Sequence, residues 1–200
     1  MEGFAEINGV FSFLHHVDKD VTLALNSLHT PFTDTIWQFL SAREAWMVLA
    51  VVIIGILYYR LGWKKATVVL LSTILFVVLC DQTSNIVKAS VQRLRPVYDT
   101  GMLERGLHIL EDPGKLYGFF SGHAANAAGV VVCTYLGLRT DKSRKYHGYL
   151  AAMGLCGLLI GLSRIFVGKH FLGDILAGFT AGVLIGLAFG RLAAVICRKL

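Results

Sequence analysis

Long apolar runs, separated by short clusters of charged residues, constrain the fold of this 200-residue chain more than any other feature. Hydrophobic residues make up 55% of the sequence and charged residues only 16%, whereas soluble domains carry about a quarter charged residues. A helix needs roughly 17–25 residues to cross the hydrocarbon of a bilayer. Runs of about that length cover residues 36–59, 66–91, 121–138, 146–163 and 170–197. We therefore expect an all-α, polytopic membrane helix bundle with about five transmembrane helices.

Residues 1–34 are too polar to form another span. Apolar side chains there, such as Ile7, Val10 and Leu14, recur at three- and four-residue steps with charged residues between them. This pattern is typical of an amphipathic helix in the membrane interface, and a helix packed against the flank of the bundle would show it too. We expect Pro31 to end this helix. The expected organisation is one integral-membrane domain with an interfacial segment and a transmembrane bundle, over residues 1–200, 1–34 and 35–200 respectively.

The basic residues, which give a net charge of +6, lie in short clusters between the apolar runs. This arrangement favours membrane topology over the binding of nucleic acid. By the positive-inside rule, three alternating clusters belong in the cytoplasm: Arg60, Lys64 and Lys65; Arg139, Lys142, Arg144 and Lys145; and Arg191, Arg198 and Lys199. The opposite face also carries many cations, namely Lys88, Arg93, Arg95, Arg105, Lys115, Arg164 and Lys169. An anionic ligand bound at that extracytoplasmic face would explain them.

The stretch from Ser163 to Asp174 concentrates charge between two apolar runs. If the following helix begins near His170, then His170 and Asp174 lie four residues apart on one helix face. A carboxylate in that position would orient the imidazole and make it a better nucleophile or base. Arg164 and Lys169 beside it are suited to hold a phosphate. A charged interfacial turn without chemistry is the alternative for this stretch alone.

Two further stretches map to the same face. Lys88 and Arg95 are seven residues apart, which is two helical turns, and Pro96 marks the expected helix end. Ser121-Gly122-His123 opens the third span, where free backbone N–H groups at a helix N-terminus can bind an anion. Alone, Ser121 also fits an ordinary N-cap and His123 an ordinary interfacial histidine.

Together these stretches resemble the three-part signature of the type-2 phosphatidic acid phosphatase superfamily, with its order and internal spacings: Lys88-x6-Arg95-Pro96, Ser121-Gly122-His123 and Ser163-Arg164-x5-His170-x3-Asp174. The resemblance covers residues 88–174. One departure is Phe120, where the family often has a proline before its Ser-Gly-His motif. That departure bears on the rigidity of the loop and not on the chemistry.

The resemblance implies a role for each matching position. His170 would attack phosphorus and form a phosphohistidine, Asp174 would orient His170, and His123 would protonate the leaving oxygen. The implied phosphate-binding groups are Lys88, Arg95, Arg164 and the backbone N–H groups of Ser121 and Gly122. Phosphoryl transfer depends mainly on positioning and charge neutralisation, which three cations can supply. No Asp/Glu cluster has divalent-metal spacing, so we expect a metal-independent enzyme without a cofactor.

A row of small residues follows the third motif. Asp174, Gly178, Gly182, Gly186 and Gly190 recur every four residues. Such a row lies along one helix face and permits very close packing of a neighbouring helix. We therefore expect the catalytic pair to be anchored on the tightly packed side of the last helix.

The function implied is a lipid phosphatase of the bacterial cytoplasmic (inner) membrane, with its active site on the extracytoplasmic side. Its partners would be the bilayer and a phosphorylated lipid, of which a headgroup phosphate monoester or pyrophosphate is hydrolysed. We expect undecaprenyl pyrophosphate as the substrate, with phosphatidylglycerophosphate, phosphatidic acid and lipid A as alternatives. A lipid phosphotransferase and a non-catalytic lipid-phosphate binder or transporter are the other interpretations.

Overall fold

A computed structural model describes residues 2–200, with side chains described from residue 12 onward. Its helices are α1 (Glu2–Asn26), α2 (Pro31–Ser41), α3 (Arg43–Val91), the 3-10 helix η1 (Pro96–Tyr98), α4 (Thr100–Glu104), α5 (Gly122–Leu138), α6 (His147–Phe166) and α7 (Leu172–Cys197). Over the described residues there is one isolated bridge, between Leu94 and Tyr117, and no strand. The prediction of an all-α fold is therefore confirmed.

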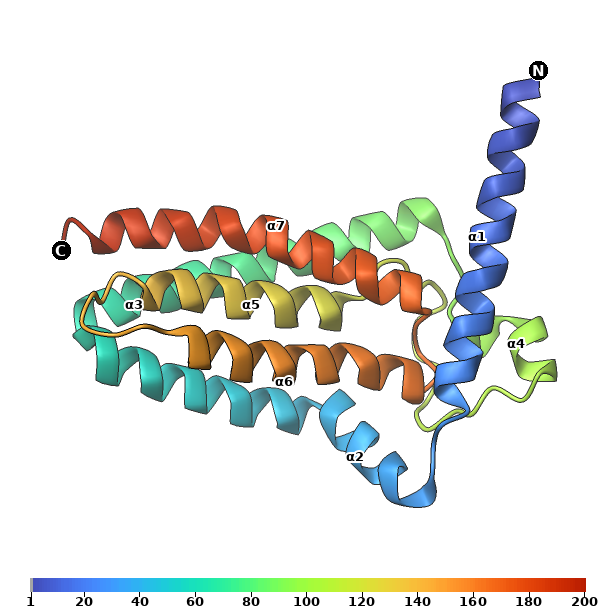
Figure 1. The fold of residues 1–200 in the computed structure, drawn as a ribbon, viewed down its shortest axis with the longest axis horizontal. Coiled ribbons are helices and arrows are strands. Elements are labelled where there is room, and N and C mark those ends of the chain that lie inside the picture. The colour runs from blue at the N-terminus through green and yellow to red at the C-terminus, as the bar shows by residue number, and fades with distance from the viewer. Residues whose placement is uncertain (1) are drawn as a thin grey trace.

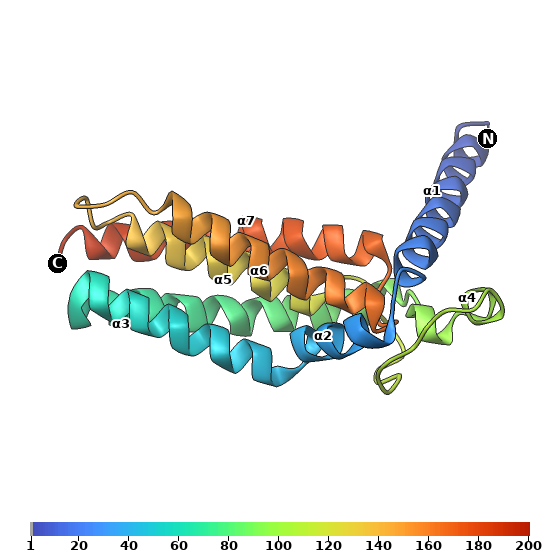
Figure 2. The same cartoon turned by 60° about the horizontal axis from the view of Figure 1, so that its bottom comes forward.

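Helix α3 is a hairpin of two arms. At Gly62 the backbone leaves the helical region, with φ 69° and ψ 169°, a conformation that glycine adopts without steric cost. The second arm runs back beside the first (Figure 1), and the Tyr58 and Thr67 hydroxyls lie 3.0 Å apart near the turn. The two arms, α5, α6 and α7 are the five long segments of the predicted bundle (Figure 2).

Apolar surface covers the outside of this bundle. Helices α3, α6 and α7 are each long and apolar enough to cross a membrane, and α5 has 17 residues, a length of about 25 Å. Large side chains such as Val51 and Ile86 are 70% and 66% exposed on α3. In water such a surface would be unfavourable, whereas lipid accepts it. The protein is an integral membrane protein.

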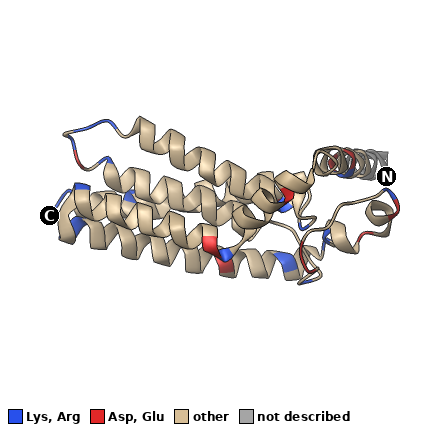
Figure 3. Cartoon of the chain, turned by 90° about the horizontal axis from the view of Figure 1, so that it is seen from below, with Lys and Arg blue, Asp and Glu red and all other residues tan. Residues whose placement is uncertain are grey.

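The basic clusters of the predicted cytoplasmic loops share one end of the bundle, the end that carries the C-terminus (Figure 3). Arg60 of the α3 turn pairs with Asp141 of the α5–α6 connection at 2.7 Å. The Cys197 thiol near the C-terminus lies 3.6 Å from the Lys65 carbonyl oxygen. The third-motif connection between α6 and α7 lies at the opposite end, beside α1 and α4 (Figure 1).

The last helix packs against α5 along its row of glycines. A Cβ atom at Gly182 would lie 2.0 Å from the Ala125 carbonyl oxygen, and one at Gly178 would lie 2.5 Å from the Ser121 carbonyl oxygen. No side chain fits there, so the two backbones meet directly. The close-packed seam predicted from the spacing of the glycines is confirmed.

The N-terminal part differs from expectation in two places. Helix α1 ends at Asn26, and Pro31 begins α2 instead of ending α1. Thr30 is the N-cap of α2, and proline fits the first turn of a helix because its missing N–H would have no partner there. The expected span 36–59 is also broken, because Ala42 is extended and α3 starts at Arg43.

Helix α1 contacts the third-motif connection through its second half. Thr22 accepts a hydrogen bond from the Leu172 N–H at 2.9 Å. These contacts fit the alternative in which the N-terminal segment packs against the bundle. The predicted apolar stripe also includes Ile7 and Val10, which lie outside the residues whose side chains are described.

Candidate active site

A cavity of about 970 Å³ opens between the α3 hairpin and α5. Its polar end is lined by Lys88, Arg95, Lys115, Gly122, His123, Arg164 and His170. All three motifs therefore contribute to one cavity, although their residues come from α3, α5, α6 and the connections that follow α3 and α6. Asp174 and Ser121 are fully buried behind this wall.

His170 and Asp174 form a buried pair. His170 Nδ1 lies 3.3 Å from Asp174 Oδ2, and the two residues are 3% and 0% exposed. The helical spacing predicted for them is wrong, because α7 starts at Leu172 and His170 precedes it. Asp174 instead lies in the first turn of α7, where its carboxylate also accepts the Phe171 N–H at 3.1 Å. The helix start thus holds the carboxylate against the imidazole.

The protonation of His170 follows from this environment. Burial lowers the pKa of His170, and the Asp174 carboxylate opposes part of that shift. The imidazole is therefore neutral at neutral pH. With Nδ1–H donating to Asp174, the lone pair resides on Nε2.

The second oxygen of Asp174 is held by Arg93. Arg93 Nη1 lies 2.8 Å from Asp174 Oδ1, and its Nη2 lies 2.6 Å from Asp18 Oδ2 on α1. The guanidinium also stacks on the Phe171 ring at 4.2 Å. Asp18 in turn accepts the Gly173 N–H at 2.8 Å. A chain of charged contacts thus runs from α1 to His170.

The sequence alone predicts no role for Arg93 or Asp18. Arg93 is one of the cations expected at the extracytoplasmic face, and its position two residues before Arg95 is the available signal. Asp18 carried no signal, because its contact with Arg93 joins residues 75 positions apart.

Lys88 and Arg95 reach the cavity by different routes. Helix α3 ends at Val91 and Gln92 adopts a left-handed conformation with φ 53°, so Arg95 lies beyond the helix and the two cations line the same cavity from different elements. The Arg95 side chain donates to the Tyr117 and Pro113 carbonyl oxygens, each at 3.3 Å. Lys88 donates to the Ser84 hydroxyl at 2.8 Å.

Gly118 allows the first and third motifs to approach each other. A Cβ atom there would lie 3.1 Å from Arg95 Cγ, 3.2 Å from Asp174 Oδ2 and 3.5 Å from His170 Nδ1. The loop backbone therefore packs directly against the His170–Asp174 pair, and even a methyl group would crowd it.

Arg164 is 6% exposed and is surrounded by oxygen atoms. It donates to the Ser41 hydroxyl, and its Nη1 lies 3.6 Å from Glu111 Oε2. The same carboxylate oxygen lies 3.5 Å from Lys169 Nζ. Glu111, which the sequence did not single out, therefore lies between two cations of the predicted anion site. The Arg164 Nε is buried without a partner.

The buried cations of the loops lack full charge compensation. Burial lowers the pKa of both Arg95 and Lys169, since moving a cation out of water disfavours its charged form. An anion in the cavity would offset this cost for Arg95, which lines it, whereas Lys169 pairs with Glu111. The polar end of the cavity is therefore suited to a phosphate.

The second motif offers one free backbone N–H group fewer for phosphate binding than predicted. Ser121 is the N-cap of α5 and accepts the Ala124 N–H at 3.4 Å. Its own N–H donates to the Asp174 carbonyl oxygen at 2.9 Å, so it is not free to bind phosphate as expected. Gly122 and His123 line the cavity, and His123 meets the Trp46 ring edge-on at 6.0 Å.

Comparison with known proteins agrees with this geometry. The PAP2 superfamily model matches residues 65–195. The lipid A 4'-phosphatase of Porphyromonas gingivalis is 27% identical over 87% of this chain and 72% of its own length. Phosphatidylglycerophosphatase B of Bacillus subtilis is 30% identical over 84% of this chain and 79% of its own length.

Two crystal structures share the fold. One is a transmembrane PAP2 type phosphatidylglycerolphosphate phosphatase from Bacillus subtilis, with a TM-score of 0.70, 20% identity and coverage of 92% of this chain and 87% of that one. The other is LpxE of Aquifex aeolicus, with a TM-score of 0.59, 21% identity and coverage of 87% and 92%. The chain thus belongs to the PAP2 superfamily, as an integral membrane phosphatase with the helical fold of these neighbours.

Proposed function

We propose that this phosphatase hydrolyses a phosphate monoester on the headgroup of a membrane lipid through a phosphohistidine intermediate. The observation that carries the proposal is the shape of the cavity. Its polar end holds the cations and histidines, and it continues as an apolar groove lined by Trp46, Ile53, Leu57, Leu70, Ile74 and Val77. A lipid can place its phosphate at one end while its tails remain in the groove.

In the proposed first step, the Nε2 lone pair of His170 attacks phosphorus as the bond to the leaving oxygen breaks. His123 gives its proton to that oxygen, so the lipid leaves as an alcohol. Asp174 holds Nδ1–H and stabilises the positive charge that develops on the imidazole. Water then attacks the phosphohistidine, His123 accepts a proton from it, and inorganic phosphate is released.

The remaining groups neutralise the charge of the transferring phosphoryl group. Lys88, Arg95 and Arg164 would contact its oxygens, together with the Gly122 N–H. We propose that these three cations supply the neutralisation that a metal ion supplies in other phosphatases, so catalysis needs no divalent ion. Arg93 and Asp18 would act at one remove, by fixing the orientation of Asp174.

The relatives narrow the choice of lipid. Their names refer to lipid A 4'-phosphate and to phosphatidylglycerophosphate, and the expected preference for undecaprenyl pyrophosphate finds no support among them. We propose a lipid A-type phosphate as the first candidate, because two of the relatives are lipid A 4'-phosphatases, and phosphatidylglycerophosphate as the second.

The placement in the cell follows from charge. Arg60 of the α3 turn pairs with Asp141 of the α5–α6 connection, and Cys197 near the C-terminus contacts Lys65. Because these basic connections lie at one end of the bundle, we infer from the positive-inside rule that the cavity's polar end lies on the extracytoplasmic side. We propose the bacterial inner membrane as the location, and a single domain in which residues 1–34 support the bundle formed by residues 35–200.

The test is phosphate release by the purified protein in detergent, without added metal ions, from lipid A, phosphatidylglycerophosphate, phosphatidic acid and undecaprenyl pyrophosphate. We expect turnover of the first two and none by His170→Ala. Turnover by that variant would overturn the nucleophile. Turnover of undecaprenyl pyrophosphate alone would overturn the choice of lipid, and transfer of labelled phosphate to another lipid would indicate a phosphotransferase.

A further inference from the structure

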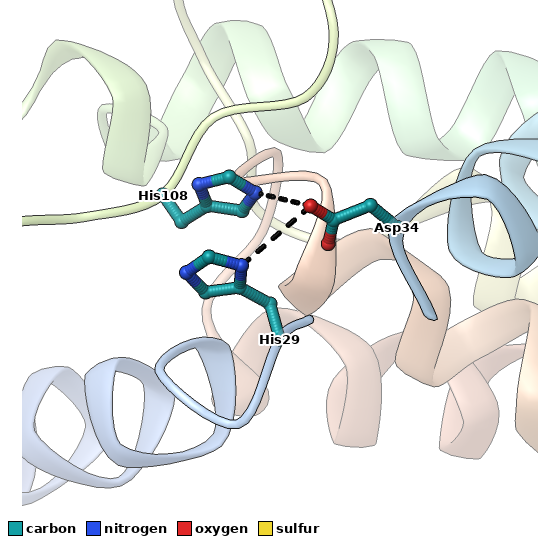
Figure 4. Close-up of side chains that lie close together, drawn as sticks. All are labelled: His29, Asp34 and His108. Carbon is teal, nitrogen blue, oxygen red and sulfur yellow. Dashed lines mark hydrogen bonds and ion pairs between the residues drawn. The ribbon is translucent and has the colours of Figure 1, made fainter. Parts of the chain in front are cut away.

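Three metal-ligand side chains meet away from the cavity (Figure 4). His29 follows α1, Asp34 lies on α2, and His108 lies on the loop between α4 and α5. The Asp34 Oδ2 lies 3.0 Å from His108 Nε2 and 3.6 Å from His29 Nδ1. Among the described residues this is the one group of three or more such side chains whose ligand atoms all lie within 4.8 Å of one another.

Two atoms of this cluster lack a hydrogen-bond partner although they are buried. They are His29 Nδ1 and Asp34 Oδ1. Most buried polar atoms in proteins are paired, and an exception calls for an unseen ligand or a special role. With His29 Nδ1 unprotonated, both atoms carry lone pairs: Nδ1 can bind a cation directly, and Asp34 Oδ1 can accept a hydrogen bond from a water molecule bound to that cation.

The surrounding backbone holds two of the ligands in place. The side-chain amide of Asn26, which is fully buried, donates to the His108 carbonyl oxygen at 3.0 Å and accepts the His108 N–H at 2.8 Å. The capping box of Thr30 and Thr33 fixes the start of α2, and the Asp34 N–H donates to the Thr30 carbonyl oxygen at 2.9 Å. Contacts with Asn26 and with the capped start of α2 therefore hold His108 and Asp34 in position.

We propose that His29, Asp34 and His108 bind one divalent transition-metal ion of the zinc type. Zinc prefers imidazole and carboxylate ligands at about 2.0–2.2 Å in a tetrahedron, which places neighbouring ligand atoms about 3.4 Å apart. The separations of 3.0 and 3.6 Å bracket that value. Two neutral imidazoles and one carboxylate give the site a charge that a divalent cation complements, and a water molecule would complete the tetrahedron.

Binding requires one ring to tilt. The His29 and His108 rings are stacked, with centroids 3.5 Å apart and planes 6° from parallel, whereas an ion lies close to the plane of each imidazole that binds it. His29 is free to tilt, because it lies in the turn between α1 and α2 and its side chain is 32% exposed. His108, which is tied through Asn26, would keep its place.

The ion would fasten the loop that borders the phosphate site. Three residues beyond His108, Glu111 contacts Arg164 and Lys169, and the Asp112 carbonyl oxygen accepts a hydrogen bond from Lys169. An ion bridging His108 to His29 and Asp34 would add to the contacts that His108 already makes with Asn26 and Asp34, and would further restrict Glu111 relative to these cations. None of the three ligands lines the cavity, so this role is structural and separate from the proposed catalysis.

The test is titration of the chelator-treated full chain with zinc chloride, followed by calorimetry. We expect one tight site per chain, weakened at least 100-fold in His108→Ala and in Asp34→Asn, which keeps the size of the side chain. His147→Ala, at the other end of the bundle, and His170→Ala, in the phosphate site, should leave this site unchanged.

Hydrogen exchange gives a second measurement that does not depend on activity. Zinc should slow exchange of residues 105–112 in the wild type and in His170→Ala, but not in Asp34→Asn. The proposal is overturned if the wild type binds no zinc, if both ligand variants bind it as tightly as the wild type, or if binding is lost in His170→Ala and retained in His108→Ala.

Discussion

The seam between α5 and α7 and the groove between the arms of α3 are packed in opposite ways. In the seam, Gly182 lets the α7 backbone touch the α5 backbone. In the groove, side chains such as Ile54 and Ile74 leave an open cavity, and Ile74 is 49% exposed. The His170–Asp174 pair lies beside the seam, and His170 lines the cavity. Under the proposed function, this difference would fix the reacting groups on the rigid side and admit the lipid from the open side.

The largest effect on activity is expected for Asp174, which lies on the glycine-lined face of α7 and contacts His170. Asp174→Asn removes the charge that stabilises the imidazolium and leaves Arg93 without its buried partner. We expect kcat to fall by about 10²–10⁴-fold, as measured by phosphate release under saturating lipid. Lipid binding should persist, and a loss of less than about tenfold would contradict the assigned role of Asp174.

The seam itself is tested by Gly182→Ala. The added methyl group would lie 2.0 Å from the Ala125 carbonyl oxygen, and overpacking of this kind costs about 1–3 kcal/mol. The melting temperature in detergent should fall by several degrees, about 2–4 °C for each kcal/mol.

Gly154→Ala on α6 is the matched control, because nothing lies within 4 Å of a Cβ atom there. That variant should be as stable as the wild type or slightly more so, since alanine favours a helix. Equal melting temperatures for the two variants would show that the seam is not tightly packed.

A smaller effect on kcat is expected when the chain of contacts from α1 to Asp174 is weakened. Asp18→Asn keeps the hydrogen bond to the Gly173 N–H but weakens the hold on Arg93, and thus on Asp174. We expect kcat to fall by about tenfold, the scale of one charge-assisted hydrogen bond, with KM unchanged.

Asp20→Asn, two residues further along α1, is its control. Asp20 pairs with Arg105 at the surface, with side-chain exposures of 60% and 49%, where ion pairs contribute little. A rise in KM without a fall in kcat for Asp18→Asn would show that Asp18 does not act through the His170–Asp174 pair.

The smallest effect is expected in the groove. Ile74→Trp would fill space that we propose for the lipid tails, whereas its neighbour Leu75, 60% exposed, does not line the cavity. We expect the tryptophan at 74 to raise KM for a long-chain lipid several-fold, the scale of one or two buried methylene groups, and to spare a short-chain soluble substrate. The same tryptophan at 75 should change neither, and equal effects at both positions would argue against the groove.

These regions also differ in how far the sequence predicts them. The seam follows from a four-residue glycine period, and the five long segments follow from apolar length; both are properties of neighbouring residues. The motif residues could be found because each motif lies within a short stretch of the sequence. Arg95 and His170 lie outside the helices in which the sequence placed them, because helix ends depend on local features such as the left-handed C-cap Gln92 and the N-cap Phe171, whose N–H Asp174 accepts.

Contacts between distant segments had no local signal. Asp18 reaches Arg93, Glu111 reaches Arg164, and His29 stacks on His108 only after the chain has folded. Each of these contacts includes a residue from α1, from the turn that follows it, or from the α4–α5 loop. Those parts lie outside the long apolar runs, so hydropathy could not predict which distant residues they contact.

One measurement decides whether His170 is the nucleophile. The protein would be mixed with a lipid labelled with ³²P on the scissile phosphate, stopped by denaturation within one turnover, and digested. We expect label on the peptide that contains His170 in the wild type, and neither label nor phosphate release in His170→Ala. Label on another residue, or phosphate release by His170→Ala, would contradict a phosphohistidine mechanism at this site.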